Sequence, residues 1–484
     1  MNKTFTLILL LSFCFSSLHA QKDPVYVAKI KKNGRYGLVS SSGKVLIQPQ
    51  FDQIEGFHEN LALVQKDGKW GYIDKTGRII AEPQYDEAFS FNNGIAGIRK
   101  DGKYGFVDNT GKLIVPLQYD KIENFGAELK PFRENGKWGF LDSKGNVKIA
   151  ANYDYVRSFH DGLAPFNVGG RPVGENGMLG GKWGYINESG IEIIPATYDD
   201  AWTHVEGLAA VKAKDNWGYI NTAGKTVITP QFKSCGNFSN GIALIEKSMG
   251  YGFIDKTGKI ITPPQFITIG GTFVEDHMEV MKGGKWGFVN RQGKVIVFPE
   301  YDEVRRFSDG LAAVRKGRKW GYVDKNGKLI VPIQFDNVFS FNNGVSMIQS
   351  GGKWGCIDKA CKKIIETQYE EMSWSFNEGL AVIKKDGKYG YINNAGKVII
   401  EPQYKEALDF HDGLAAVNQD GKWGYIDKTG NFIIPAQFDD ASSFSGGIAP
   451  ANKGGKWGYI SKGGTFVINP QFDEAQSFVN ITPQ

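Results

Sequence analysis

Short apolar runs recur along the chain, separated by turns rich in Gly, Asp and Asn. In residues 379–400, two such runs flank Asp386-Gly387, and a third run follows Gly396. An Asp-Gly pair between two strand-like runs predicts a two-residue hairpin, because a type I′ turn needs positive φ at both central residues. Gly at the end of the next turn fits a left-handed backbone conformation. The pattern predicts three antiparallel strands.

The segment that follows these strands predicts a different element. Pro402 is expected to end the third strand, because proline removes a donor from the hydrogen-bonded ladder. Residues 404–410 then place apolar side chains three positions apart, which favours one or two helical turns. One unit is therefore predicted to be a three-stranded β-meander with a short helical corner, and the fold class to be all-β.

The unit occurs about thirteen times, and an aromatic-Gly pair anchors each copy. Successive anchors lie 34 or 35 residues apart, except for one spacing of 45. The anchors are Tyr36, Trp70, Tyr104, Trp138, Trp183, Trp217, Tyr251, Trp286, Trp320, Trp354, Tyr389, Trp423 and Trp457. A fixed period in this range indicates a solenoid, a propeller or a linear array. Since propellers usually have about four to eight blades, we expect an open or superhelical array, with one or two propeller-like rings as the alternative.

The aromatic residues predict how neighbouring units pack. Phe or Tyr stands fifteen residues after every anchor, and Gly follows every anchor directly. A chain shorter than about 40 residues rarely buries enough surface to fold alone. We therefore expect the aromatic side chains of stacked units to form a continuous core. The Gly after each anchor would allow a neighbouring backbone or ring to approach closely.

The phrase Gly-Lys-Trp-Gly-Tyr-Ile-Asp-Lys-x-Gly, found from Gly68 to Gly77 and from Gly421 to Gly430, resembles the WG-repeat (KWG) family of bacterial secreted and surface repeat proteins. The resemblance covers essentially all of residues 21–484. It implies a β-rich repeat domain with a binding or scaffolding role. Some units depart from the pattern: Tyr replaces the anchor Trp in four of them, Leu38 and Cys356 replace an aromatic residue, and Asn216 replaces a Lys.

Residues 1–20 differ from the array. Lys3 precedes an apolar stretch, and Leu18-His19-Ala20 resembles a signal-peptidase site. We expect a signal peptide over residues 1–20, and a secreted or periplasmic protein that associates with the outer surface. A lipoprotein signal is the less favoured alternative, because bulky Phe13 precedes Cys14. The array is expected to fill residues 21–484, which leaves no room for a separate catalytic domain.

Charge narrows the class of partner. The net charge is +5, and Lys and Arg alternate with Asp and Glu without a basic block, so nucleic-acid binding is not expected. No further stretch is apolar enough to span a membrane. Two charged series follow the repeat, and both are expected to form a solvated, balanced surface. They are Lys69, Lys103, Lys137, Lys182, Lys285, Lys353, Lys422 and Lys456, and Asp52, Asp86, Asp120, Asp154, Asp302 and Asp336.

Unit ten carries two cysteines on either side of one tight turn. Cys356 stands where other units have Tyr, Phe or Leu, and Cys361 stands where all others have Gly. In an oxidising compartment this arrangement predicts a disulfide across the hairpin. Two free thiols are the alternative.

The long spacing between Trp138 and Trp183 contains an insertion at a hairpin turn. Hairpin tips tolerate insertions at little cost, so a neutral insertion is one interpretation. A binding loop is the other. Its candidate residues are Gly170, Arg171, Glu175 and Asn176.

The sequence contains no Ser-His-Asp set, phosphate-binding glycine loop or Cys-x-x-Cys pair, so we expect no enzyme, cofactor or metal site. His58, His160 and His411 share one repeat position that other units fill with Asn or Ser, which is typical of an exposed turn. The expected function is a monomeric, non-enzymatic scaffold that binds protein partners at the cell envelope. A glycan- or cell-wall-binding protein is the alternative, and it depends on exposed anchor Trp side chains.

Overall fold

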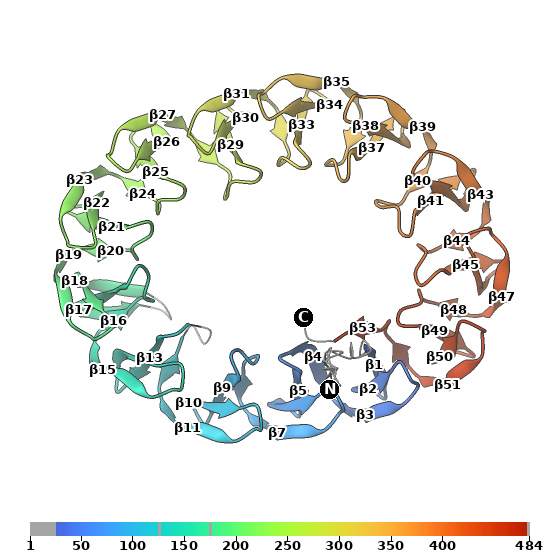
Figure 1. Ribbon diagram of the computed structural model, residues 1–484, viewed down its shortest axis with the longest axis horizontal. Coiled ribbons are helices and arrows are strands. Elements are labelled where there is room, and N and C mark those ends of the chain that lie inside the picture. Colours follow the sequence, from blue (N-terminus) through green and yellow to red (C-terminus); the bar gives the residue numbers. More distant parts are fainter. Residues whose placement is uncertain (1–25, 124–126, 174–176, 482–484) are drawn as a thin grey trace, which may run out of the picture.

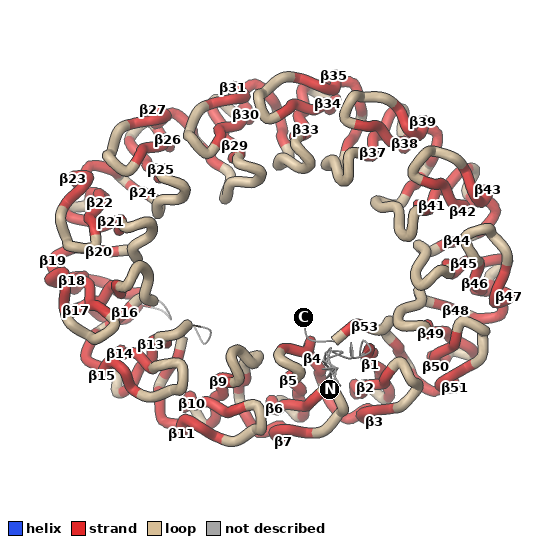
Figure 2. The backbone as a smooth tube through the Cα atoms, in the orientation of Figure 1, coloured by secondary structure: helices blue, strands red, loops and turns tan. Residues whose placement is uncertain are grey.

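The computed structural model describes residues 26–123, 127–173 and 177–481 as thirteen small antiparallel sheets in a closed ring (Figure 1). Each sheet forms one blade, and the blades surround a central opening. The described residues form strands, turns and loops without a helix (Figure 2). The predicted all-β fold is confirmed. The closed ring corresponds to the propeller-like alternative given above. The open or superhelical array, which the number of repeats favoured, is not formed.

Blades follow one another in chain order around the ring. They span residues 26–51 (blade 1), 53–85 (blade 2), 87–119 (blade 3), 121–153 (blade 4), 155–198 (blade 5), 200–232 (blade 6), 234–266 (blade 7), 268–301 (blade 8), 303–335 (blade 9), 337–369 (blade 10), 371–404 (blade 11), 406–438 (blade 12) and 440–472 (blade 13).

Blade 12 illustrates the common anatomy. Its strands are β44 (Glu406–Ala407), β45 (Ala415–Gln419), β46 (Lys422–Ile426) and β47 (Phe432–Phe438), in this spatial order. The short first strand faces the central opening, and the fourth strand lies on the outer perimeter (Figure 1). A blade therefore has four strands, where the sequence predicted three.

The predicted helical corner is wrong, and the first strand takes its place. Glu406 and Ala407 pair with Asn418 and Val417 of β45, and the Leu408 amide donates to the Ala416 carbonyl at 2.9 Å. The segment is too short for a stable helical nucleus. Its amide groups find partners on the adjacent strand instead, while the three-residue spacing of its apolar side chains is accommodated by a bend.

Pro402 does not end the third strand of its unit, as the sequence predicted. It lies within β43 (Val398–Tyr404), the outermost strand of blade 11. An edge strand leaves alternate amides without a ladder partner, so proline is tolerated there and hinders pairing with another chain.

The predicted turns are confirmed. Asp386 and Gly387 have φ values of 50° and 74°, as a type I′ hairpin requires. Gly396 has φ of 80° at the end of the next turn.

The Gly after each anchor has a steric role. In blade 12 the register between β46 and β47 shifts on both sides of Tyr425, so the two backbones approach closely at Gly424. A Cβ at this position would lie 2.6 Å from the carbonyl oxygen of Ile434. The predicted close approach of a neighbouring backbone is confirmed, and it occurs within the blade.

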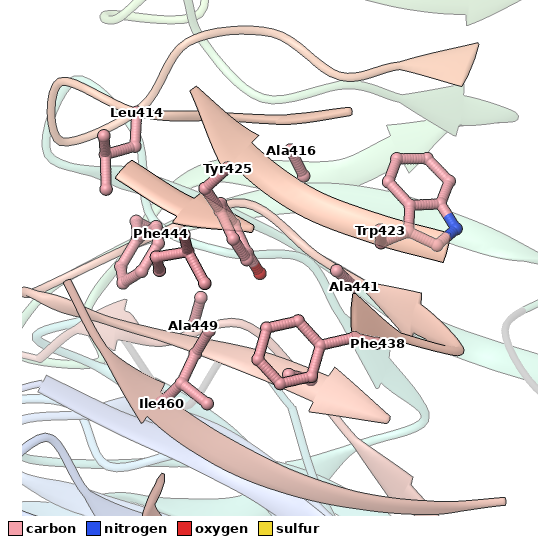
Figure 3. Packing of buried hydrophobic residues seen from close by; sticks show 11 residues of the cluster. Leu414, Ala416, Trp423, Tyr425, Phe438, Ala441, Phe444, Ala449 and Ile460 are labelled. Atoms are coloured by element: carbon pink, nitrogen blue, oxygen red, sulfur yellow. The ribbon is translucent and has the colours of Figure 1, made fainter. Parts of the chain in front are cut away.

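The hydrophobic core consists of separate clusters, each shared by two consecutive blades. Figure 3 shows the cluster between blades 12 and 13. Tyr425 is fully buried there, and its ring meets Phe444 edge-on at 4.8 Å. The Tyr425 hydroxyl donates to the Ser442 carbonyl of blade 13 at 2.8 Å. The residue two positions after the anchor thus joins one blade to the next by packing and by a hydrogen bond.

The anchor rings lie toward the margin of these clusters. Four anchor Trp side chains are buried: Trp138, Trp183, Trp320 and Trp423. The other five are partly buried: Trp70, Trp217, Trp286, Trp354 and Trp457. The anchors therefore belong to the core, as the sequence predicted, and none presents an exposed ring.

The C-terminal segment closes the ring. β52 (Glu474–Ala475) and β53 (Val479–Asn480) both pair with β1 (Tyr26–Lys32), so the last residues supply the inner strands of blade 1 (Figure 1). Phe478 is buried against Tyr459 of blade 13, at a centroid distance of 5.1 Å. Blade 1 is completed only when the two ends of the array meet.

Candidate ligand-binding site

Members of the two charged series pair with each other, or with a charged residue at the equivalent position of another repeat, which the sequence did not predict. The Lys456 ammonium lies 2.6 Å from an Asp473 carboxylate oxygen, and the other oxygen accepts the Asn33 amide of blade 1 at 2.7 Å. Each ion pair therefore ties one blade to a hairpin turn of the next. The pairs are Lys69–Asp86, Lys103–Asp120, Lys137–Asp154, Lys182–Asp199, Lys285–Asp302, Lys319–Asp336, Lys353–Glu370, Lys422–Asp439 and Lys456–Asp473.

A second link, which we name the turn clasp, joins neighbouring blades near the central opening. The Glu206 carboxylate of blade 6 accepts the amides of Asn240 and Gly241 of blade 7 at 2.5 and 3.0 Å. The Lys256 ammonium of blade 7 lies 3.0 Å from the same carboxylate. Burial raises the pKa of Glu206, but the Lys256 ammonium and the two amides outweigh it and hold the pKa below its ordinary value.

Turn clasps occur at several blade boundaries. Complete clasps with acid and lysine are Glu206–Lys256, Glu275–Lys325, Asp309–Lys359 and Glu378–Lys428. The carboxylates of Glu59, Asp161 and Asp412 accept amides of the next blade.

Replacing Glu206 with Gln is expected to lower the free energy of unfolding by about 1 kcal/mol at neutral pH, because an amide cannot accept both N–H groups and face an ammonium. The lowered pKa of Glu206 means that its contribution is complete above the ordinary Glu pKa of about 4.3 and is lost as pH falls through the lowered value. Urea midpoints should therefore differ between variant and parent near pH 7 and converge at about pH 3. Glu192→Gln, an exposed carboxylate without an ion pair among the described residues, is the control. An equal difference at both pH values would contradict the clasp.

The boundary between blades 10 and 11 lacks both charged groups of the clasp. Asn343 stands at the position of the acid, and Asn394 at the position of the lysine. Neither side-chain amide makes a hydrogen bond within the described chain, and both residues are exposed. An ion pair that closes other boundaries is thus replaced here by two neutral amides without partners.

The same boundary lacks the buried tyrosine. Cys356 of β38 (Lys353–Asp358) takes the position that Tyr425 has in blade 12, so no phenol ring fills the space between the blades. Phe376, the residue that such a ring would pack against, is only partly buried, whereas the equivalent Phe410 and Phe444 are fully buried.

The boundary between blades 10 and 11 also differs from that between blades 11 and 12 by one inserted residue. The loop after β40 (Glu371–Met372) is one residue longer than the matching loop of blade 12, and it exposes the Trp374 side chain to 77%. The Trp374 ring lies 4.3 Å from Phe339, whose ring is 5.2 Å from Trp354. The result is a row of three tilted aromatic rings that runs from the partly buried Trp354 to the surface.

A pocket of about 690 Å³ opens at this boundary. Its wall combines the Trp374 and Phe376 rings with hydroxyl and amide side chains: Ser340, Asn342, Asn343, Ser373, Ser375 and Asn394. Arg305 is its one charged lining residue, and that guanidinium is engaged with the Val338 carbonyl and the Trp320 ring. A second hollow of about 240 Å³ adjoins Trp374 on the side of blade 12.

The structure does not bring together the cysteines for which a disulfide was predicted. Cys356 and Cys361 are free thiols, and they pack into different clusters, on the two sides of blade 10. Burial raises the pKa of the Cys356 thiol to about 11. The Cys356 side chain is small and lines the pocket, where a tyrosine ring would occupy part of the space.

The predicted binding loop of blade 5 is an extended hairpin. Gly170 and Arg171 lie in β17 (Leu163–Val173), which pairs with β18 (Gly177–Asn187), and Arg171 is opposite Leu179. Glu175 and Asn176 lie outside the described residues. Trp374 was not predicted from the sequence as a candidate site residue. Two features of the sequence could have indicated it: the 35-residue spacing between Trp354 and Tyr389, and the Cys at position 356.

The described residues contain no group of three His, Cys, Asp or Glu side chains arranged to hold a metal ion. Across the same ranges, no helix has the length and hydrophobicity needed to cross a bilayer.

A family model with the description "WG containing repeat" matches the chain thirteen times. The matches cover residues 36–70, 70–104, 104–138, 138–171, 183–216, 217–248, 251–286, 286–320, 320–354, 354–389, 389–423, 423–457 and 457–480. The chain belongs to the WG-repeat family. Most WG repeats run from one anchor to the next, so they contain the outer strands of one blade and the inner strands of the following blade. No curated protein sequence matches the chain.

Solved structures resemble the WG-repeat ring only distantly. A eukaryotic initiation factor is 11% identical over 70% of this chain and 99% of its own, with a TM-score of 0.31. PorZ, a bacterial surface component of the type-IX secretion system of Porphyromonas gingivalis, is 10% identical over 90% and 80%, with a TM-score of 0.22. Kluyveromyces lactis Hsv2 is 14% identical over 39% and 71%, with a TM-score of 0.23. Likenesses at this level carry no argument about function.

Proposed function

We propose that this WG-repeat protein is a non-enzymatic scaffold that is exported to the bacterial cell envelope and binds a protein partner through the hairpin of blade 5. Export is supported by the signal peptide predicted over residues 1–20. The hairpin carries the proposal for the partner. Its strands are 11 residues long, against 6 in the corresponding strands of blade 6.

The extension of this hairpin exposes apolar side chains. Val168, Val173 and Leu179 are 49%, 52% and 53% exposed, and they lie near the exposed Arg171. Clustered exposed apolar residues with an arginine are typical of protein interfaces. The closed ring gives such an arm a rigid base, because both strands continue into the sheet of blade 5.

Binding of the purified mature protein to cell envelopes of the source bacterium tests this function. Protease treatment of the envelopes should abolish binding, and glycosidase treatment should leave it unchanged. A variant in which Asp-Gly replaces residues 169–181 should keep the ring and lose envelope binding, because blade 2 has this turn naturally at Asp67-Gly68. Met249→Ser, which changes an exposed residue at the hairpin of blade 7, should bind normally. Envelope binding that depends on the hairpin and is undiminished by protease would contradict a protein partner.

A further inference from the structure

We propose that the pocket between blades 10 and 11 is a binding site for a neutral oligosaccharide, with the Trp374 indole as its stacking platform. This site is independent of the blade 5 hairpin. It rests on four departures from the repeat that coincide at one boundary: Asn343, Cys356, the inserted Trp374 and Asn394. Each departure alone is an ordinary variation, but all four enlarge or line the same space.

The aromatic part of the pocket fits the apolar face of a pyranose ring. Trp374 is 77% exposed although Phe339 supports it from one side, so the indole is held in place and still open to solvent. Indole combines a large apolar surface with low conformational freedom, which favours stacking on a ligand. The pocket volume of about 690 Å³ lies within the range of about 300–1,000 Å³ that is common for small-molecule sites.

The polar part of the pocket fits hydroxyl groups. The side-chain amides of Asn342, Asn343 and Asn394 make no hydrogen bond within the described chain. An amide offers two donors and one carbonyl acceptor, so it can bind two neighbouring hydroxyls at once. Ser340 and Ser375 add hydroxyl groups to the same wall.

The charge of the pocket selects against ionic ligands. Its single charged lining residue, Arg305, is held by the Val338 carbonyl and by Trp320 at 4.6 Å from the ring centroid. The acid and the lysine of the turn clasp, which pair at four other boundaries, are both absent here. A neutral, hydroxyl-rich ligand is therefore favoured over an acidic polysaccharide.

More than one sugar ring fits the surface around Trp374. The second hollow, of about 240 Å³, shares Met372, Ser373 and Trp374 with the main pocket and extends to Asp409 of blade 12. The Asp409 Oδ1 atom is buried without a hydrogen-bond partner in the described chain. A chain of sugars that crosses the indole would extend toward Asp409, which lines this hollow.

Isothermal titration calorimetry of the mature protein with pentasaccharides tests the site. The probes are cellopentaose, laminaripentaose, mannopentaose and chitopentaose, with a galacturonic acid pentamer as the acidic probe. At least one neutral probe should bind with a dissociation constant of about 0.1–1 mM, and the acidic probe should not. Trp374→Ala should weaken binding about tenfold or more, since loss of the platform removes most of the contact area.

A second variant separates binding from folding. The double substitution Asn343→Glu with Asn394→Lys rebuilds the turn clasp, so it should abolish binding while the urea midpoint stays equal or rises. Trp202→Ala is the matched control. Trp202 is also exposed, but it lies at the boundary between blades 5 and 6, where the Asp161 carboxylate still accepts the Gly207 amide. Saccharide binding should be normal in this control and in the shortened blade 5 hairpin. The proposal is overturned if no neutral pentasaccharide binds at about 10 mM, if the acidic probe binds more tightly, or if Trp374→Ala binds as the parent does.

Discussion

Truncation after Phe472 is expected to open the ring and to lower the free energy of unfolding by roughly 5 kcal/mol. The deletion removes β52 and β53, which pair with β1. It also removes the buried Phe478 ring and the Gln476 carbonyl, which accepts the Tyr459 hydroxyl at 2.9 Å. Burial of a phenylalanine contributes about 1.5–3 kcal/mol and a hydrogen bond about 1 kcal/mol, and the lost strand pairing adds to both.

Urea unfolding and small-angle scattering measure the two consequences of this truncation. The truncated protein should unfold at a lower urea concentration and have a larger radius of gyration than the parent. Truncation after Asn480 is the control, because β53 is then intact. Equal stability and equal size of the two truncated proteins would show that the C-terminal strands do not hold the ring closed.

Tyr425→Ala is expected to cost about 3–5 kcal/mol, because it leaves a cavity in the core shared by blades 12 and 13. The side chain is fully buried and contacts Phe444, and its hydroxyl binds the Ser442 carbonyl. Tyr425→Phe keeps the ring and should cost only about 1 kcal/mol. The two substitutions therefore separate packing from hydrogen bonding.

Chemical denaturation of both Tyr425 variants checks this expectation. Glu401→Gln in blade 11 serves as the control, since the exposed Glu401 side chain makes no ion pair in the described chain. If Tyr425→Ala and Tyr425→Phe have the same urea midpoint, the ring does not contribute as the buried geometry requires.

Local structure was predictable from the sequence because it depends on a few neighbouring residues. Asp386-Gly387 has the dihedral angles of the predicted hairpin, and Gly424 lies where an adjacent backbone approaches. The aromatic repeat correctly predicted that blades pack through their rings. The helical corner failed because the spacing of apolar residues in 404–410 fits a bend as well as a helix, and β45 supplies the hydrogen-bond partners.

The arrangement between blades was not predictable in the same way. Ring closure depends on the angle between successive blades, and no single repeat encodes that angle. The pairing of Lys456 with Asp473 joins residues 17 positions apart that belong to different blades. The sequence therefore indicated most members of the two charged series, but their contact with each other followed only from the fold.

The candidate site also depends on the arrangement of neighbouring blades, so it was not predictable from the sequence. Cys356 was an exception in the sequence pattern, and a disulfide with Cys361 was the hypothesis that followed from the predicted signal peptide. In the structure its neighbours across the boundary are Trp374 and Phe376, which line the same pocket. Four separate departures from the repeat become one site only when blades 10 and 11 lie side by side.

Electron cryomicroscopy of the full-length mature protein tests ring closure, on which the blade boundaries and the proposed sites depend. The predicted result is a class of end-on averages that show one closed ring of thirteen blades around a central opening, with blade 1 contacting blade 13. Averages that show an open arc, a superhelix or two smaller rings would contradict it.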